Sequence, residues 1–223
     1  MKNIYNMPVK RQTTAAELHK NVPPGWYYHS IRENPLQRYW HKRRFEEAAK
    51  LIEPVKGKVL DIGSADGVFS KVILDKSKAR QIVGIDVVAT SVGWANQHWR
   101  KNKKMKFILA DAHKLPFKGE TFGGVFAMEV LEHVYDPKKV MQEVKRVLKK
   151  DGYAVFLVPS DNLLFRIVWF LWGFYRGKIW SDTHIQTYRN SYLPKLARKV
   201  GFKKIEADKK FLMGMLHIIK VRK

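Results

Sequence analysis

Apolar residues recur along the chain with two different periods, and these periods predict the order of its strands and helices. Short apolar runs typical of strands lie at residues 58–62, 81–88, 105–110, 122–128 and 153–158. Helical spacing marks residues 36–52, 68–74, 90–103, 137–149 and 193–200. Two final strands, at residues 203–210 and 212–221, are expected to form a hairpin at the sheet edge. Because strands separated by helices favour crossover connections, we expect an α/β fold with a doubly wound, seven-stranded, mostly parallel sheet.

Two interruptions of this pattern define the expected domain organisation. The first 35 residues contain the breakers Pro8, Pro23, Pro24, Gly25 and Pro35. We therefore expect an irregular N-terminal arm at residues 1–35. An N-terminal amphipathic helix then opens a single domain, residues 36–223, a size that suits one core. Within it, residues 163–182 form an apolar insertion between the fifth strand and the last helix, where we expect a lid.

Composition excludes several classes of protein. Hydrophobic residues make up 45% of the chain and aromatic residues 13%, enough for a packed core. The absence of cysteine excludes disulfides, thiolate zinc sites and cysteine nucleophiles, and we predict no metal site. The longest apolar run, residues 163–175, is shorter than the roughly 20 residues that span a bilayer, and no signal peptide is recognisable. We expect a cytoplasmic protein, either free or peripheral at a membrane.

The charge of the chain is strongly positive. Lys and Arg number 43 against 20 Asp and Glu, a formal net charge of +23. The excess is densest after residue 160, with 14 basic and 4 acidic residues. Such a balance favours an anionic partner, which leaves nucleic acid, a membrane surface or a phosphorylated substrate open.

The segment V-L-D-I-G-S-A-D-G at residues 59–67 joins a predicted strand to a predicted helix. A strand of an open α/β sheet that ends in Asp61 and Gly63 directs its loop into the crevice where ligands bind. Gly63 and Gly67 allow close approach of the backbone, and the helix N-terminus offers free N–H groups. A glycine-rich turn alone is weak evidence, because many nucleotide-binding folds contain one.

Two further strands end in an acid. Asp86 follows an apolar strand 19 residues after Gly67, where a carboxylate can accept both hydroxyls of a ribose. Asp111 ends the next strand, at residues 107–110. Three consecutive strands thus place acids at the same sheet edge. Burying these acids is costly unless they are hydrogen-bonded or contact a ligand. The pattern therefore predicts a binding site at this edge.

This series of motifs resembles the class I S-adenosylmethionine-dependent methyltransferases, and specifically their ubiquinone/menaquinone-biosynthesis-like small-molecule branch. The resemblance is carried by residues 59–70, 82–88, 107–117, 122–137 (FGGVFAMEVLEHVYDP) and 140–159 (VMQEVKRVLKKDGYAVFLVP). A weaker match covers residues 184–202. The resemblance implies a Rossmann-like fold of seven strands with the last antiparallel, and S-adenosylmethionine as cofactor.

The family's binding positions can be carried over one by one. Asp61, Gly63 and Gly67 would surround the methionine portion, Asp86 the ribose, and Asp111 with Ala112 the adenine. Glu129, at the mouth of the fourth strand, would lie beside cofactor and substrate. The full predicted cofactor-binding set is Asp61, Gly63, Ser64, Gly67, Asp86, Val87, Asp111, Ala112 and Glu129. The chain departs from the family at Ala65, usually glycine, which is tolerable where φ is negative.

The resemblance implies methyl transfer to a small-molecule or lipid-like acceptor. The sulfonium is already an activated electrophile, so alignment can supply about 7–11 kcal/mol and a base is needed only if the acceptor loses a proton. The candidate bases are Asp161 and His184, and Tyr188 is a candidate for orienting the acceptor. Asp161 could instead cap a turn, and His184 could brace the lid. The acceptor atom and the oligomeric state stay open.

Several of these side chains also have structural interpretations. Asp86 could cap the following helix, and Asp111 could cap its loop. His133 suits proton transfer by its ordinary pKa but could equally brace the loop below the site, and His113 is expected at the surface. The insertion, with aromatic residues and Arg166 interleaved, is either an ordinary core helix or a surface that meets a membrane or a lipid-like acceptor.

Three rival functions were weighed against small-molecule methylation. NAD binding is disfavoured because the loop is D-x-G-x-x-x-G and lacks the glycine pair that admits a pyrophosphate. An RNA methyltransferase would explain the charge, but the chain has no Asn/Asp-Pro-Pro-Tyr motif, no cysteine nucleophile and no RNA-binding module. A catalytically silent binding module is supported only by Ala65. An anionic membrane surface therefore remains the favoured partner over nucleic acid.

Overall fold

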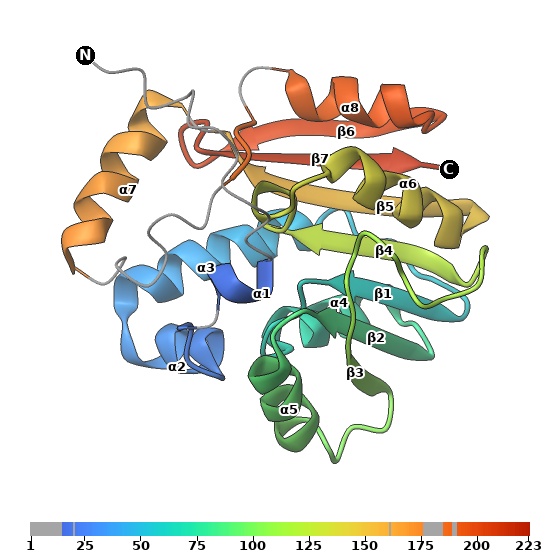
Figure 1. Cartoon of the computed structure of the whole chain (residues 1–223), viewed down its shortest axis with the longest axis horizontal. Helices are drawn as coiled ribbons and strands as arrows, with labels where there is room; N and C mark the ends of the chain where they lie inside the picture. Colours follow the sequence, from blue (N-terminus) through green and yellow to red (C-terminus); the bar gives the residue numbers. More distant parts are fainter. Residues whose placement is uncertain (1–14, 20, 161, 176–184, 189–190) are drawn as a thin grey trace.

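Seven strands form one sheet in the order β3-β2-β1-β4-β5-β7-β6 (Figure 1). The structure is a computed structural model that describes residues 15–19, 21–160, 162–175, 185–188 and 191–223. The strands are β1 (Lys58–Ile62), β2 (Gln81–Asp86), β3 (Met105–Leu109), β4 (Phe122–Met128), β5 (Leu148–Pro159), β6 (Lys204–Phe211) and β7 (Leu216–Arg222). Neighbours from β3 to β5 pair in parallel, and β7 pairs antiparallel with both β5 and β6. The predicted fold, including its antiparallel last strand, is confirmed.

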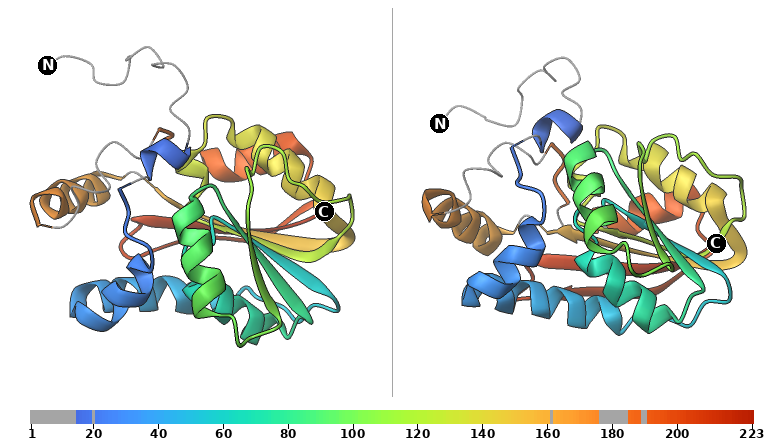
Figure 2. Two further views of the ribbon diagram at one scale, coloured as in Figure 1. Left: turned by 60° about the horizontal axis from the view of Figure 1, so that its bottom comes forward. Right: turned by 90° about the horizontal axis from the view of Figure 1, so that it is seen from below.

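Helices cover both faces of this sheet (Figure 2). On one face α3 (Pro35–Ala49), α4 (Val68–Ser77) and α5 (Ala89–His98) pack against the strands. On the other lie α6 (Pro137–Val147) and α8 (Tyr192–Val200). The remaining helices are α1 (Ala15–Leu18), α2 (Trp26–Glu33), the short 3₁₀ helix η1 (Leu131–His133) and α7 (Leu163–Tyr175). None of the described helices combines the length and apolar character needed to cross a membrane.

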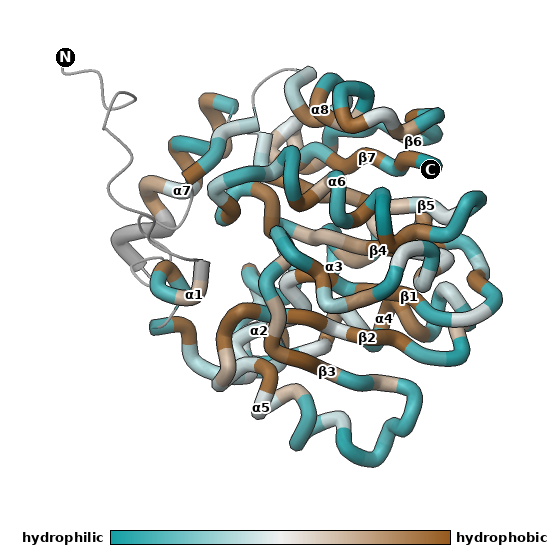
Figure 3. The backbone as a smooth tube through the Cα atoms, turned by 45° about the vertical axis from the view of Figure 1, so that its right-hand side comes forward, coloured by the Kyte–Doolittle hydropathy of each residue, from teal (hydrophilic) through white to brown (hydrophobic). Residues whose placement is uncertain are grey.

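Burial on both faces explains why the strands are almost continuously apolar. In β5, Val155 and Leu157 join the core beneath α3–α5, whereas Ala154 and Phe156 join the core beneath α6 and α8. The central strands accordingly carry mostly hydrophobic residues (Figure 3). Parallel strands covered by helices on both sides show this pattern, and it fixes which strand ends meet at one edge.

The N-terminal arm differs from its predicted irregularity, because helices α1 and α2 lie within it. Gly25, with φ of 74°, stands just before α2, and the carboxylate of Asp66 accepts the Tyr28 N–H at 2.8 Å. Pro35 does not break structure but begins α3, where Asn34 Oδ1 accepts the Gln37 N–H at 3.1 Å. Proline suits the first turn of a helix, since the N–H it lacks has no partner there. Of the predicted lid insertion, residues 163–175 form α7, and 176–182 lie outside the described residues.

Candidate cofactor site

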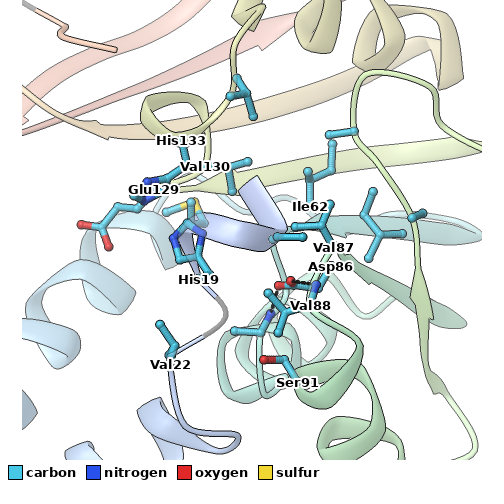
Figure 4. Close-up of a pocket in the computed structure, with 18 of the residues that line it drawn as sticks. His19, Val22, Ile62, Asp86, Val87, Val88, Ser91, Glu129, Val130 and His133 are labelled. Atoms are coloured by element: carbon cyan, nitrogen blue, oxygen red, sulfur yellow. Dashed lines mark hydrogen bonds between the residues drawn. The ribbon is translucent and has the colours of Figure 1, made fainter. Parts of the chain in front are cut away.

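A cavity of about 350 Å³ lies at the carboxyl ends of β1, β2, β3 and β4. This volume falls within the roughly 300–1,000 Å³ of small-molecule sites. One side, here called the cofactor wall, consists of Gly63, Ala65 and Asp66 together with loop residues 86–88 and 110–113. The opposite side, the N-terminal wall, consists of Ala16, His19, Val22, Trp26 and Tyr27. Figure 4 shows His19 projecting into the space between Glu129 and Asp86.

The glycines of the motif loop are fixed by close packing. The N–H groups of Gly63 and Ser64 both donate to the Ile85 carbonyl, at 2.8 and 3.0 Å. A Cβ on Gly63 would lie 2.5 Å from a methyl of Val130. Gly67, at the start of α4, has φ of 77° and meets the ring of Phe107 in the same way. At Gly63 and Gly67 the loop is therefore packed too closely to leave room for a side chain.

Ala65 lacks the negative φ at which alanine would be tolerated in this loop. Its φ is 44°, in the left-handed region that disfavours L-residues with a Cβ. Its N–H donates to Asp86 Oδ2 at 2.9 Å, and its side chain lines the cavity. The chain thus keeps a glycine-like loop conformation at Ala65, at a cost in backbone strain.

Asp61 is buried behind the loop rather than in the main cavity. Its carboxylate accepts the Ser70 hydroxyl at 2.5 Å and lines a small neighbouring cavity of about 40 Å³. Burial raises the pKa of Asp61 to about 7, and the charge of Asp86 adds to the rise while the Ser70 hydrogen bond opposes it. Ser64 also lines the small cavity, and its buried hydroxyl has no hydrogen-bond partner among the described residues.

Asp66, the second acid of the motif, ties together two helices. Its Oδ2 accepts the N–H of Tyr28 in α2, and its Oδ1 accepts the N–H of Val68 in α4 at 3.2 Å. The Trp99 indole donates to its carbonyl at 2.8 Å. The motif loop thus anchors the first turn of α2, which carries Trp26 and Tyr27 of the N-terminal wall. Sequence reasoning missed this role, although an Asp directly before a helix is a recognised capping signal.

Asp86 lies at the mouth of β2, where the ribose is expected. Oδ2 accepts the Ala65 N–H and Oδ1 accepts the Val88 N–H, both at 2.9 Å (Figure 4). Burial raises its pKa, while these hydrogen bonds and the charge of His19 oppose the rise. Each carboxylate oxygen has two lone pairs, so each can still accept a further hydroxyl. Val87 lines the cavity beside it.

Asp111 and Ala112 line the cavity at the end of β3. Asp111 accepts both the N–H of His113 at 2.8 Å and its Nδ1–H at 2.7 Å. The Nδ1 carries the proton because Nε2 accepts the Asp136 N–H at 3.3 Å. The His113 ring also stacks on Tyr135, with centroids 3.8 Å apart. His113 is buried, so its expected surface position is wrong, and its role is to fix the loop that carries Asp111.

Glu129 meets a buried cation at the mouth of β4. Its φ is 57°, and its carboxylate forms an ion pair with Arg44 of α3. Arg44 is also hydrogen-bonded to the Tyr27 hydroxyl and lies near Glu132. Burial lowers the pKa of Arg44 and raises those of Tyr27 to about 12 and Glu132 to about 8. This group joins the N-terminal wall to β4, and no motif in the sequence marks it.

Two histidines meet above the cavity. The rings of His19 and His133 lie edge to face, with centroids 4.5 Å apart, and both residues line the cavity. Figure 4 shows them on the same side of the cavity as Glu129. His133 therefore braces the N-terminal wall as well as facing the cavity.

The three predicted acceptor-side residues are differently placed. Asp161 and His184 lie outside the described residues. Tyr188 is buried, donates its hydroxyl to the Leu131 carbonyl at 3.0 Å, and is not among the described residues that line the cavity. Burial raises its pKa well above the usual range. Its predicted role in orienting an acceptor stays a prediction.

The chemistry of the lining suits a cationic adenosyl ligand. Asp86 and Glu129 supply carboxylates, and Asp111 has a half-exposed side chain that remains accessible. Among the residues that the structure describes, no group of three or more His, Asp or Glu is arranged to hold a metal ion. The cofactor wall can bind hydroxyl and amino groups, and the N-terminal wall presents mainly apolar surface to whatever enters beside it.

Comparisons with known proteins agree with this geometry. Residues 60–156 match the methyltransferase domain family. A ubiquinone/menaquinone biosynthesis C-methyltransferase of Desulfotalea psychrophila is 28% identical over 192 residues, covering 79% of this chain and 77% of that protein. A demethylmenaquinone methyltransferase of Thermotoga maritima is 30% identical over 118 residues, 53% of this chain and 49% of that protein. The fold is similar to an S-adenosylmethionine-dependent methyltransferase structure from Aquifex aeolicus, with TM-score 0.62, 15% identity and coverage of 95% and 99%.

Proposed function

We propose that the chain is a class I S-adenosylmethionine-dependent methyltransferase and that it methylates a small or lipid-like acceptor. The observation that carries this proposal is the contrast within one cavity. Carboxylates line the cofactor wall, whereas Ala16, Val22 and Trp26 supply apolar surface on the N-terminal wall. An acceptor bound against the apolar side would face the cofactor without crossing a polar barrier.

In the proposed arrangement the cofactor wall holds S-adenosylmethionine. Asp86 accepts the ribose hydroxyls, Asp111 and Ala112 contact the adenine, and the loop from Gly63 to Gly67 lies along the methionine portion. The bound cofactor supplies an electrophilic methyl group on a positively charged sulfur. Glu129, held by Arg44, places a carboxylate near that charge.

The N-terminal wall and the mouth of β4 would position the acceptor. Alignment of acceptor, methyl and sulfur is the main requirement, so the residues here need to exclude water and fix an orientation. Asp161 and His184 remain the proposed bases for an acceptor that must lose a proton. The relatives named for quinone methylation support an apolar, ring-containing acceptor for this chain.

Calorimetric titration with S-adenosylhomocysteine tests the cofactor part of the proposal. We expect micromolar binding by the wild type and at least about 100-fold weaker binding by Asp86→Ala, which removes hydrogen bonds of a charged group worth about 1.5–3 kcal/mol each. Asp75→Ala, an exposed acid paired with Lys71 on α4, is the matched control and should bind as the wild type does. Equal heats for Asp86→Ala and wild type would refute the assignment.

The acceptor class is tested separately, because the charge of +23 also favours RNA. Methyl transfer from labelled cofactor should reach a short-chain hydroquinone and not bulk RNA. Filter binding of bulk RNA should be weak at physiological salt. Tight, salt-sensitive RNA binding, together with transfer of the labelled methyl group to RNA, would show that the acceptor is a nucleic acid and not lipid-like.

A further inference from the structure

Helix α7 exposes apolar side chains where a surface helix normally carries polar ones. Leu163 is 72% exposed, Phe170 64% and Leu171 60%, with Ile167 and Val168 also exposed. The spacing 163, 167, 170 and 171 places them along one side of the helix. We call these five residues the α7 face.

The other side of α7 already has its partners. Phe165 is buried, and its ring stacks on that of Trp169 with centroids 5.6 Å apart. The helix starts at a fixed point, since Asn162 accepts the Phe165 N–H at 2.7 Å. The α7 face therefore lies on a different side of the helix from the buried Phe165.

Further apolar and basic residues lie at the same end of the molecule. Asn162 donates to the Met213 carbonyl at 3.2 Å, which places the exposed Met213 beside the start of α7. Figures 1 and 2 show the N-terminal half of α3 at the end of the fold where α7 projects. That half of α3 exposes Leu36 and Tyr39 together with Lys42.

The segment from residue 163 to 180 carries charge of one sign. From residue 163 to 180 the sequence contains Arg166, Arg176 and Lys178 and no acidic residue. The chain as a whole carries +23. Apolar side chains flanked by cations match the boundary of an anionic bilayer, where acyl chains lie beneath phosphate groups.

We propose that the α7 face docks this protein on an anionic membrane surface. Leu163, Ile167 and Phe170 enter the acyl boundary, and the cations meet the lipid phosphates. Thirteen residues of helix extend about 20 Å, so α7 lies along the surface and does not cross it. The inference rests on the proposed function in one respect, namely that a lipid-like acceptor would be taken from the bilayer. α7 follows β5, and the cavity lies at the same carboxyl ends of the strands.

A second copy of the chain fits this face less well. A two-fold dimer through α7 would place the same cations opposite one another, and each copy brings a charge of +23. An anionic bilayer neutralises these charges, whereas a second copy doubles them. The positive charge therefore favours an anionic membrane over a second copy as the occupant of the α7 face.

Vesicle co-sedimentation tests the proposal without requiring turnover. The wild type should bind vesicles of equal parts phosphatidylcholine and phosphatidylglycerol, bind phosphatidylcholine alone weakly, and lose binding as salt is raised. Ile167→Glu with Phe170→Glu should weaken binding to the mixed vesicles by at least about 100-fold, since each of the two buried apolar side chains contributes about tenfold or more. Leu109→Glu is the matched control, an exposed apolar residue at the end of β3, and should bind as the wild type does.

Each outcome has a distinct meaning. S-adenosylhomocysteine affinity, measured for all three proteins, should be equal and shows that the fold and cofactor site are intact. Equal vesicle binding by wild type and the α7 variant, or none by the wild type, would overturn the membrane proposal. A wild-type dimer in sedimentation that the α7 variant loses, without vesicle binding, would assign the face to a second copy. Vesicle binding without methylation of an apolar acceptor would instead overturn the proposed acceptor and leave the docking surface standing.

Discussion

The two walls of the cavity differ in how their polar groups are held. In the cofactor wall, Asp86 is fixed by backbone N–H groups of Ala65 and Val88, and Asp111 by its neighbour His113. In the N-terminal wall, the anchoring contacts reach far along the chain, from Tyr28 to Asp66 and from Arg44 to Glu129. The first wall is specified by short loops at strand ends, the second by tertiary contacts of preceding helices.

In the proposed function, this difference assigns the cofactor to one wall and the acceptor to the other. A wall built from strand-end loops is fixed by the sheet itself, and it suits the cofactor, which is the same for every acceptor. A wall built from separate helices can change without disturbing the sheet, and it suits the variable part, the acceptor. Side chains that connect the walls should then couple the stability of one to the other.

The largest expected effect concerns Asp61, which lies behind the cofactor wall. Its pKa is about 7 in the folded protein against an ordinary 3.8, so the folded state binds more protons between these values. Stability contributed by this group is therefore lost as pH rises from about 4 to 7, by up to about 1.4 kcal/mol per pH unit and about 4 kcal/mol in all. Asp61→Asn should remove this contribution and flatten the slope, leaving the contribution of Glu132, whose pKa burial also raises. Urea unfolding across that pH range measures it.

The exposed Asp75 provides the control for this pH dependence. Asp75→Asn should unfold with the same pH slope as the wild type, because its side chain is largely solvated. If Asp61→Asn also kept the wild-type slope, the Asp61 carboxyl would be ionised in the folded protein across the range. The cofactor wall would then be supported by a charge rather than by a neutral hydrogen-bonded acid.

The ion pair between Arg44 and Glu129 tests the connection between the walls. Arg44→Met or Glu129→Gln alone should each lower the free energy of unfolding by about 3 kcal/mol, because each leaves a buried partner uncompensated. The double variant should recover much of that loss. A double-mutant cycle from urea unfolding measures the coupling, and strictly additive losses would mean that the walls are independent at this point.

Asp66 is the second connection, with a smaller expected effect. Asp66→Ala removes the acceptor of N–H groups in both α2 and α4, at about 1 kcal/mol for each helix and about 2 kcal/mol in total. Asp136→Ala removes the single cap of α6, whose Oδ1 accepts the Lys139 N–H at 2.9 Å, and should cost half as much. Hydrogen exchange should show faster exchange in α2 only for Asp66→Ala. Unchanged α2 exchange would show that this cap does not hold the N-terminal wall.

The same contrast explains what the sequence could predict of the fold. Strands β1, β2 and β4 were predicted close to their observed bounds, because burial on both faces leaves an uninterrupted apolar run. Helix α2 was missed because the prolines around it were interpreted as breakers. Gly25 and Pro35 instead mark helix starts, and α2 depends on a cap from Asp66, far along the chain.

The site divides along the same line. Asp86 and Asp111 could be predicted to line a cavity, because the carboxyl ends of parallel strands meet at one edge of the sheet. Arg44 could not, since it stands in a run of cations with Lys42 and Arg43 and only packing against Tyr27 distinguishes it. Periodicity shows which helix residues turn inward but not that a charge among them meets a carboxylate in another element.

The smallest expected effect is at Ala65, where the cofactor wall departs from the motif of the methyltransferases that the sequence resembles. A residue with a Cβ in the left-handed region costs about 1–2 kcal/mol of stability, and glycine avoids this cost. Glycine gives back about 0.5–1 kcal/mol of that gain, because it loses more conformational entropy on folding. Ala65→Gly should therefore raise the free energy of unfolding by about 0.5 kcal/mol. Ala89→Gly, at the exposed first residue of α5, should lower it by up to about 1 kcal/mol, as glycine does in helices. If urea unfolding gives changes of opposite sign for the two variants, the backbone conformation at residue 65, and not the replacement of alanine by glycine as such, sets the effect. A loss of stability in Ala65→Gly would mean that the methyl group makes compensating contacts in the cavity, and that the cofactor wall has adapted to it.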